Sequence, residues 1–382
     1  MQKNNLKKES LKLHKKENGK IFTGLSVKLN TKKDLALSYT PGVAFVCDEI
    51  KKDSKKYKTL TSAGKTVAVI SDGSAVLGLG NIGPKPAMSV MEGKSALFKK
   101  FADLNSVPIV LDTQNPDEVI QTIKNIAPSF AGINLEDIKA PQCFEVEEKL
   151  KKILNIPVFH DDQHGTAIVV LAGLINALKV VKKKKEKVKV VINGTGSAGI
   201  AIGKLLNQYG FKNIVFLDSK GIVSKKRNDL NKYKKEVLKF SKENSNGDLL
   251  VALENADIFV GVSKADLLKK EHIEVMNQKP IVFALANPNP EISKENAKKF
   301  GVEVLATGRS DCKNQVNNLL AFPGIFKGVI ENDKKQITQE MKIKTAQTIA
   351  SFIKKPSKDK FIPSVFEKKL VKKIVKEIKK CK

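Results

Sequence analysis

Short apolar runs alternate with amphipathic segments along the first 160 residues of the chain. Short apolar runs bounded by turn residues are typical of buried strands, whereas apolar positions spaced three or four apart are typical of helices. Strands are predicted at residues 67–71, 107–112, 130–135 and 156–160, and helices at residues 94–102, 116–126 and 143–154. This alternation predicts a parallel sheet covered by helices, because parallel strands need a crossover between them.

The second half of the chain repeats the alternation and then ends in helices. A helix is predicted at residues 165–181, followed by a basic linker at 182–187. Further strands are predicted at residues 188–193, 213–218, 257–262, 281–285 and 302–305, and helices at 316–331, 337–354 and 364–380. The predicted fold is α/β. An N-terminal α/β substrate domain with a parallel sheet spans residues 1–160, and a Rossmann-type dinucleotide-binding domain with a helical C-terminus spans 161–382.

A glycine-rich turn follows the strand at residues 188–193. Gly194 allows a sharp bend, Gly196 lets the backbone approach a pyrophosphate, and Gly199 lets the next helix pack closely on the strand. The pyrophosphate then lies on free N–H groups at the start of that helix. The next strand ends in Asp218, which is placed to accept a hydrogen bond from a ribose 2′-OH. The candidate cofactor contacts are Gly194, Gly196, Ser197, Ala198, Gly199, Asp218, Ser263 and Asn287.

A second run with the same spacing, Gly78, Gly80 and Gly83, shows that the glycine pattern is weak on its own. Pro84 and Pro86 follow it directly, and residues 72–77 separate it from the preceding strand. A dinucleotide turn requires a strand just before it and a helix just after it. This second run is therefore interpreted as a ligand-facing loop.

The formal net charge of +29 raises the question of nucleic-acid binding. Lysines are spread over every segment, however, and the chain has only two arginines, four tyrosines and no tryptophan. Surfaces that recognise nucleic acids favour arginine forks and stacking aromatic rings. We predict no specific nucleic-acid partner, and we expect the positive field to attract small anionic substrates.

Neither a membrane span nor a disulfide is predicted. The most apolar run, residues 167–181, is short for a bilayer and contains Asn176 and Lys179. The lysine-rich N-terminus lacks the apolar segment of a secretory signal. The four cysteines stand far apart, without metal-ligand or redox spacing. We expect a cytoplasmic protein.

Acidic side chains follow two of the predicted strands at the point where each strand ends. Glu136 and Asp137 follow the strand at 130–135, and Asp161 and Asp162 follow the strand at 156–160. Four carboxylates at such strand ends would repel one another, and Mg²⁺ or Mn²⁺ would relieve the repulsion because these cations prefer oxygen ligands. The simpler alternative is that these acids favour helix N-termini. A zinc site that includes the flanking histidines is a lesser alternative, since no third nitrogen or sulfur ligand is near in sequence.

Two further residues are candidates for proton transfer. Lys94 lies at a predicted helix start, where a cation opposes the helix dipole and so adds little stability. Beside a metal cation its pKa could fall far enough for a general base. Tyr39 lies in a turn set by Pro41 and Gly42, and its phenol could donate a proton. The alternatives are an ordinary surface lysine and a tyrosine that only packs.

Six motifs resemble those of malic enzymes of the shorter bacterial type, and they occur in the same order. They lie at residues 38–44, 71–83, 92–95, 134–138, 160–166 and 307–311. The resemblance implies a homodimer that oxidatively decarboxylates (S)-malate to pyruvate and CO₂. It also implies NAD or NADP together with Mg²⁺ or Mn²⁺ as cofactors.

The resemblance implies three catalytic residues. Lys94 corresponds to the base that takes the C2 hydroxyl proton, and Asp161 corresponds to the residue that orients this lysine. Tyr39 corresponds to the acid that protonates C3 after CO₂ has left.

The resemblance also implies the groups that hold the ligands. Glu136, Asp137 and Asp162 correspond to the metal ligands. Asn287 and Asn317 correspond to positions that touch substrate or nicotinamide.

The choice between the two cofactors rests on Asp218, which favours NAD because it repels a 2′-phosphate. Residues 219–220 and 225–226 include lysines that could pair with that phosphate, so NADP stays possible. Two alternatives to the malic enzyme prediction are a metal-independent amino-acid dehydrogenase and a non-catalytic nucleotide- or nucleic-acid-binding protein.

Overall fold

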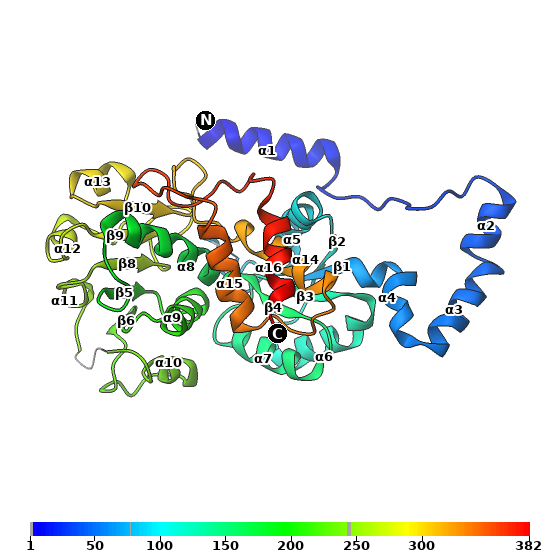
Figure 1. The fold of residues 1–382 in the computed structure, drawn as a ribbon, viewed down its shortest axis with the longest axis horizontal. Coiled ribbons are helices and arrows are strands. Elements are labelled where there is room, and N and C mark those ends of the chain that lie inside the picture. Colours follow the sequence, from blue (N-terminus) through cyan, green and yellow to red (C-terminus); the bar gives the residue numbers. More distant parts are fainter. Residues whose placement is uncertain (1–2, 77, 243–245) are drawn as a thin grey trace.

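The computed structural model describes residues 3–76, 78–242 and 246–382, and it places two sheets beside each other with helices around and between them (Figure 1). In the described part, the first sheet has four parallel strands in the order β2-β1-β3-β4. These are β1 (Thr66–Ser71), β2 (Asn105–Val110), β3 (Gly132–Leu135) and β4 (Val158–His160). Every residue of the central strand β1 is buried, as expected for a parallel sheet covered on both faces.

Helices connect the strands of this first sheet. They are α5 (Pro84–Leu97), which continues into the π-helical turn Phe98–Ala102, α6 (Pro116–Ile126) and α7 (Gln142–Ile153). Helix α6 shows why such segments start where they do. Asn115 accepts a hydrogen bond from the Asp117 N–H, and Pro116 occupies the first helical position, where a missing N–H costs nothing.

The second sheet has the order β10-β9-β8-β5-β6-β7 in the described residues, with only β7 antiparallel to its neighbour. Its strands are β5 (Lys189–Asn193), β6 (Asn213–Asp218), β7 (Gly221–Ile222), β8 (Ile258–Gly261), β9 (Ile281–Ala284) and β10 (Val304–Thr307). Its helices are α9 (Ser197–Tyr209), α10 (Lys232–Val237), α11 (Leu249–Leu253), α12 (Lys270–Glu274) and α13 (Lys294–Lys299). The strand order reverses at β5, which is where a doubly wound sheet binds its ligand.

Helix α8 (Asp161–Val181) joins the two sheets through the middle of the molecule. Among the described residues it is the one helix long and apolar enough to cross a membrane, and 72% of its most apolar window is buried inside the protein. It packs on α9 and on α15 (Gln339–Ala350). These contacts make it a core helix. The remaining C-terminal helices, α14 (Phe322–Glu331) and α16 (Leu370–Lys380), pack on each other beside it.

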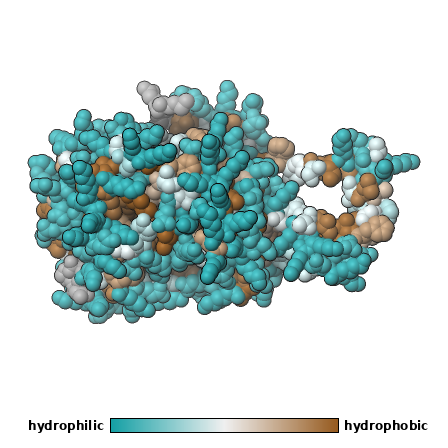
Figure 2. All heavy atoms as spheres, in the orientation of Figure 1, coloured by the Kyte–Doolittle hydropathy of each residue, from teal (hydrophilic) through white to brown (hydrophobic). Residues whose placement is uncertain are grey.

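The N-terminal residues extend away from this body. Helix α1 (Lys3–Glu17) lies along one edge, and residues 20–52, here called the arm, carry α2 (Lys32–Ser38) and α3 (Gly42–Lys52) beyond the outline of the two sheets (Figure 1). Neither α2 nor α3 buries a residue. Apolar side chains of the arm are exposed, including Phe22 at 93% and Phe45 at 69%, and brown patches mark the arm in Figure 2. The chain returns to the body through α4 (Tyr57–Leu60).

The predicted fold class is confirmed, and most predicted strands lie within one or two residues of the observed ones. The predicted helix start near Lys94 is wrong. Helix α5 begins at Pro84, so Lys94 lies in its last turn. Pro84 and Pro86 begin the helix, because proline fits the first turn, where the N–H groups have no partner within the helix.

Candidate active site

Lys94 is the centre of a buried charge cluster at the carboxyl ends of β3 and β4. Its Nζ lies 2.6 Å from Asp161 Oδ2 and 2.8 Å from Glu136 Oε1. The Phe322 ring covers the same nitrogen at 4.5 Å from the ring centroid. The side chain is 8% exposed. The alternative of an ordinary surface lysine is therefore wrong, and the last turn of α5 suits a cation because the helix dipole is negative there.

The charged groups in this cluster shift one another's pKa values. Burial lowers the pKa of Lys94, but Asp161, Glu136 and Asp162 outweigh burial and the net direction is upward. Burial raises the pKa of Asp161 to about 6, although Lys94 opposes this shift. In the protein without a cation, Lys94 is thus the positive charge that stabilises this group of carboxylates.

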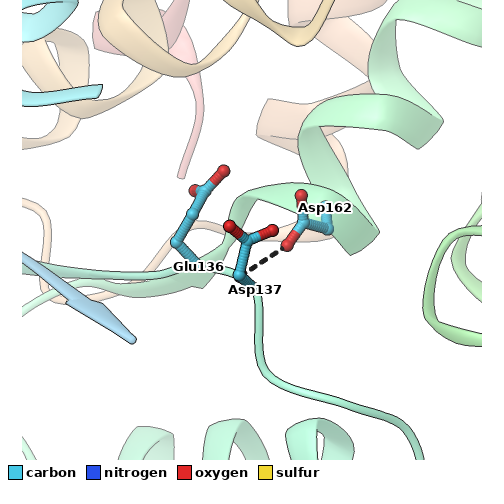
Figure 3. A group of neighbouring side chains, drawn as sticks. All are labelled: Glu136, Asp137 and Asp162. Atoms are coloured by element: carbon cyan, nitrogen blue, oxygen red, sulfur yellow. Dashed lines mark hydrogen bonds between the residues drawn. The ribbon is translucent and has the colours of Figure 1, made fainter. Parts of the chain in front are cut away.

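Glu136, Asp137 and Asp162 form the carboxylate group shown in Figure 3. One oxygen from each lies within 4.8 Å of the others, so a single ion can contact all three. The Asp137 N–H donates to Asp162 Oδ2 at 2.9 Å, which orients the Asp162 carboxylate. Burial raises the pKa of Asp162 to about 6 and also raises the pKa of Glu136. Three converging oxygen donors fit Mg²⁺ or Mn²⁺.

The alternatives for these acids fit less well. Asp161 and Asp162 lie in the first turn of α8, where the helix dipole favours acids, as the helix N-terminus alternative expects. Glu136 and Asp137 lie before α7, which starts at Gln142, so a helix start does not account for all four acids.

Both ring nitrogens of His164 are already hydrogen-bonded. Nε2 lies 2.8 Å from Glu147 Oε2, and Nδ1 lies 3.0 Å from Lys342 Nζ. The possible metal ligands found among the described residues are three carboxylates and no histidine, although His160 Nδ1 lies 3.8 Å from Asp162 Oδ2. Both observations disfavour the zinc alternative.

A second site, the cofactor pocket, lies at the carboxyl ends of β5, β6 and β8. It has a volume of about 470 Å³, and its walls include residues 193–196, 217–219 and 263–264. Gly194 has a φ of +116°, which favours glycine, and a Cβ on Gly199 would lie 1.9 Å from the Gly194 carbonyl oxygen. Gly194 therefore allows the sharp bend, and Gly199 allows the close packing of the helix start, that the sequence predicts. Ser197 and Ala198 form the first turn of α9 beside this bend.

Asp218 lines the cofactor pocket, but its carboxylate is already paired. Arg227 donates to both oxygens, at 2.7 and 3.1 Å, and Lys234 donates to one of them. Burial opposes ionisation of Asp218, yet these hydrogen bonds hold its pKa below the usual range. The sequence does not reveal this pairing, since Arg227 looks like any residue of a polar loop.

The loops after β8 and β9 carry two further candidate cofactor contacts, Ser263 and Asn287. Ser263 lines the cofactor pocket, and its Oγ accepts from Asn193 Nδ2 at 2.9 Å. Asn287 lies against the Gly78 loop of the first domain, where a Cβ on Gly78 would be 3.0 Å from the Asn287 carbonyl oxygen. The Gly78 loop therefore faces the cofactor domain.

The two remaining candidates, Asn317 and Tyr39, lie far from each other in the fold. The Asn317 side chain accepts from the Leu319 N–H at 2.9 Å, and the neighbouring Asn318 packs beside Gly165 and Asp161 at the start of α8. Tyr39 follows α2 on the arm and is 66% exposed. Helix α2, whose C-cap is Tyr39, lies beyond the outline of the two sheets and away from β3 and β4 of its own chain (Figure 1).

Other contacts of the site were not predicted. Asn134 Nδ2 donates to Glu136 Oε2 at 2.9 Å and so orients that carboxylate. Asn134 opens the motif at residues 134–138, which is the one sequence signal for it. Nothing in the sequence indicates that Phe322 covers Lys94, because the two residues are distant along the chain.

The cofactor pocket and the lysine–carboxylate cluster define a nicotinamide-dependent oxidoreductase built on two α/β domains. The profile described as malic enzyme, N-terminal domain, matches residues 15–151, and the profile described as malic enzyme, NAD binding domain, matches residues 163–381. The chain therefore belongs to the malic enzyme family.

Relatives agree with this assignment. The chain is 50% identical over 380 residues to a bifunctional malic/malolactic enzyme of Bacillus subtilis, covering 98% of this chain and 93% of that protein. It is 50% identical to an NAD-dependent malic enzyme of Geobacillus stearothermophilus, covering 93% and 75% of the two chains. An NADP-dependent malic enzyme of Escherichia coli is 46% identical, covering 87% of this chain and 44% of that protein. The crystal structure of an NAD-dependent malic enzyme from Thermotoga maritima superposes with a TM-score of 0.93 at 49% identity, covering 97% of this chain and 98% of that chain.

Proposed function

We infer that the chain oxidatively decarboxylates (S)-malate to pyruvate and CO₂ with reduction of NAD or NADP. Membership of the malic enzyme family supports this reaction over an amino-acid dehydrogenase and over a non-catalytic binding protein. The observation that carries the proposal is Lys94 held between Asp161 and Glu136, next to the group of three carboxylates. Carbon-13 NMR of labelled malate tests it. Pyruvate and bicarbonate should appear in equal amounts with the reduced nicotinamide, whereas accumulating oxaloacetate would contradict the decarboxylation step.

We propose that Glu136, Asp137 and Asp162 hold Mg²⁺ or Mn²⁺, because their oxygens converge to within 4.8 Å. When bound, the cation supplies positive charge that polarises the C2 oxygen of malate and stabilises the negative charge that develops as CO₂ leaves. Asn134 orients Glu136, and the Asp137 N–H orients Asp162. Fixed second contacts of this kind keep metal ligands in a productive geometry.

Lys94 is the proposed base for the first step. Lys94 Nζ would accept the C2 hydroxyl proton of malate, and a bound nicotinamide would take up the hydride from C2, so that malate is oxidised to oxaloacetate. Asp161 holds Nζ at 2.6 Å and so fixes its direction, and Phe322 excludes water from one side. The carboxylates raise the pKa of Lys94, and cancelling their charge lowers it toward the range that a base requires.

Tyr39 is the proposed acid for the last step. The C3–C4 bond breaks with loss of CO₂, its electron pair stays on the enolate of pyruvate, and the Tyr39 phenol donates a proton to C3. Asn287 and Asn317 are the proposed contacts to substrate or nicotinamide.

We propose a homodimer in which the Tyr39 that serves each site comes from the other chain. Tyr39 is 66% exposed, and the arm that carries it exposes apolar side chains without burying any residue of α2 or α3. Exposed apolar surface of this extent is typical of a protein–protein contact. A two-fold exchange of arms would cover these side chains and complete both sites at once.

NAD is the proposed preferred cofactor, with NADP also accepted. Asp218 supplies a negative charge at the end of β6, which disfavours a 2′-phosphate. Arg227 and Lys234 balance that charge, which supports some use of NADP. The ratio of kcat/KM for the two cofactors measures the preference.

The remaining proposals concern organisation. We place the boundary between the substrate domain and the cofactor domain at residues 160 and 161, and we propose a cytoplasmic location. We also propose no specific nucleic-acid partner, because lysines are spread over the whole chain.

A further inference from the structure

A buried carboxylate lies behind the cofactor pocket and takes no part in the reaction described above. Glu291 has no exposed surface. It follows β9 along the chain, and it packs against the end of β8, where a Cβ on Gly261 would be 2.3 Å from its carboxylate. Among the described residues, no lysine, arginine or histidine forms an ion pair with Glu291. A buried carboxylate that lacks a cation needs other donors to offset its desolvation.

The donors are two backbone N–H groups from different loops. The Ser263 N–H donates to Glu291 Oε1 at 3.2 Å, and the Ala286 N–H donates to Oε2 at 3.1 Å. Ser263 belongs to the loop after β8, and Ala286 belongs to the loop after β9 and precedes Asn287. One side chain therefore holds the two loops that carry Ser263 and Asn287, both candidate cofactor contacts.

Backbone hydrogen bonds extend this junction. The Asp266 N–H donates to the Pro290 carbonyl at 3.1 Å, and the Leu268 N–H donates to the Glu291 carbonyl at 2.9 Å. Asn193 at the end of β5 donates to Ser263 Oγ at 2.9 Å. These hydrogen bonds link the loops after β5, β8 and β9. Two of the residues that they join, Asn193 and Ser263, line the cofactor pocket.

The chemistry at this position requires a carboxylate rather than an amide. Both oxygens accept from N–H groups, so a glutamine would turn a donor toward one N–H and leave it unpaired. A buried N–H without an acceptor destabilises the loop that carries it. Glycine is equally required at position 261, because the Cβ of any other residue would occupy the space of the carboxylate.

We propose that Glu291 is a positioning residue for the cofactor, which sets Ser263 and Asn287 through the two loops that it joins. The proposal rests on the proposed function, since it assumes that the pocket at the end of β5 binds NAD or NADP. It does not assume that the chain decarboxylates malate.

The test compares binding of NADH to the full-length protein and its variants by cofactor fluorescence, without substrate. Glu291→Gln should raise the Kd for NADH by about tenfold, because the loops that carry Ser263 and Asn287 lose their common anchor and must be ordered when NADH binds. Gly261→Ala should act in the same direction, because it displaces the same carboxylate. Glu295→Gln is the matched control, since Glu295 is an exposed glutamate on the neighbouring helix α13 and its variant should bind NADH like the wild type.

Combining the variants separates positioning from general destabilisation. If both changes act through the same carboxylate, the double variant should raise the Kd no more than the stronger single variant does. Mn²⁺ binding, followed by electron paramagnetic resonance, should be unchanged in all variants, because the carboxylate group lies on other elements.

Two results would overturn the proposal: an unchanged Kd for NADH in a folded Glu291→Gln protein, or effects of the two changes that simply add. If Glu291→Gln does not fold, the proposal is tested by NADH binding to Gly261→Ala and by hydrogen exchange of the backbone amides in the wild type. The Ser263 and Ala286 N–H groups should then exchange more slowly than most other N–H groups of their loops. Fast exchange at both would contradict the proposal. Failure of the proposed function is distinguishable. Without cofactor binding, the wild type itself would bind neither NADH nor NADPH, whereas without malate decarboxylation the wild type would still bind NADH and the comparison of variants would stand.

Discussion

Lys94 is held by carboxylates that follow two different strands, and this arrangement decides what the residue can do. Asp161 follows β4 and Glu136 follows β3, and these strands are parallel neighbours. The sequence allowed the meeting of the carboxylates to be predicted, because strand ends and acidic residues are visible in it. It did not reveal the direction from which Lys94 enters, since the prolines at the start of α5 look like part of a loop.

Replacement of Lys94 tests its role as a base. Lys94→Ala should lower kcat by at least about a hundredfold, the usual contribution of a general base. NADH binding should stay within about twofold of the wild type, because Lys94 does not line the cofactor pocket. Lys99→Ala is the control, since Lys99 is exposed in the same segment and pairs only locally with Asp103 and Asn105. Near-normal turnover in Lys94→Ala would exclude the lysine as the base.

The carboxylate group predicts how cation binding depends on pH. Burial raises the pKa of Asp162 to about 6. Below this value the proton competes with the cation, so the affinity for Mn²⁺ should fall as the pH drops from 7 to 5 and level off above 7. The decrease should approach about tenfold per pH unit for each proton displaced. Electron paramagnetic resonance of free Mn²⁺ measures it, and a constant affinity across this range would contradict the assignment of Asp162 as a ligand.

At the scale of elements, helix α8 connects the carboxylates of the candidate site to the core. Its first turn carries Asp161 and Asp162, and one turn later His164 donates to Glu147 on α7 and accepts from Lys342 on α15. Glu147 also accepts from the His160 N–H at 3.0 Å, just before the helix begins. Periodicity predicted these three helices, but not this junction, because pairing between distant helices leaves no local pattern.

Lys342 at this junction predicts a pH-dependent stability. Burial, reinforced by Lys151, lowers the pKa of Lys342 to about 7, although Glu147 opposes the shift. Between pH 7 and 10 the unfolded chain then binds the proton that the folded protein lacks, so stability should rise with pH across this window. Lys342→Met should flatten this rise in thermal unfolding.

Lys379→Met provides the comparison, since Lys379 is exposed on α16 and its variant should keep the slope of the wild type. An identical slope in Lys342→Met and the wild type would show that Lys342 does not titrate in this window.

At the scale of the whole molecule, one sheet positions the cofactor pocket and the other positions the carboxylate group, while the arm extends beyond both sheets (Figure 1). The two α/β units were predictable because alternating strands and helices are visible in the sequence. The exposed position of Tyr39 was not, because a motif shows which residue is present and not where the fold carries it. The exposed apolar side chains of the arm support the proposed homodimer.

Mixing two inactive variants tests the exchange of arms. Tyr39→Ala and Lys94→Ala should each lack turnover, and each should form dimers in light scattering. After subunits are exchanged between them, half of the dimers are mixed and each mixed dimer has one complete site. About a quarter of wild-type activity should return. Absence of any recovery, with subunit exchange verified, would show that each chain supplies its own Tyr39.

The absorbance of reduced nicotinamide after (S)-malate is added to the purified protein tests malate oxidation at Lys94 directly. NAD and NADP are compared, each with and without Mn²⁺, for the wild type and for Lys94→Ala. Reduction of the nicotinamide should require Mn²⁺, should be faster with NAD and should be absent in the variant. Reduction of equal rate without any divalent cation, or in Lys94→Ala, would contradict the proposed reaction.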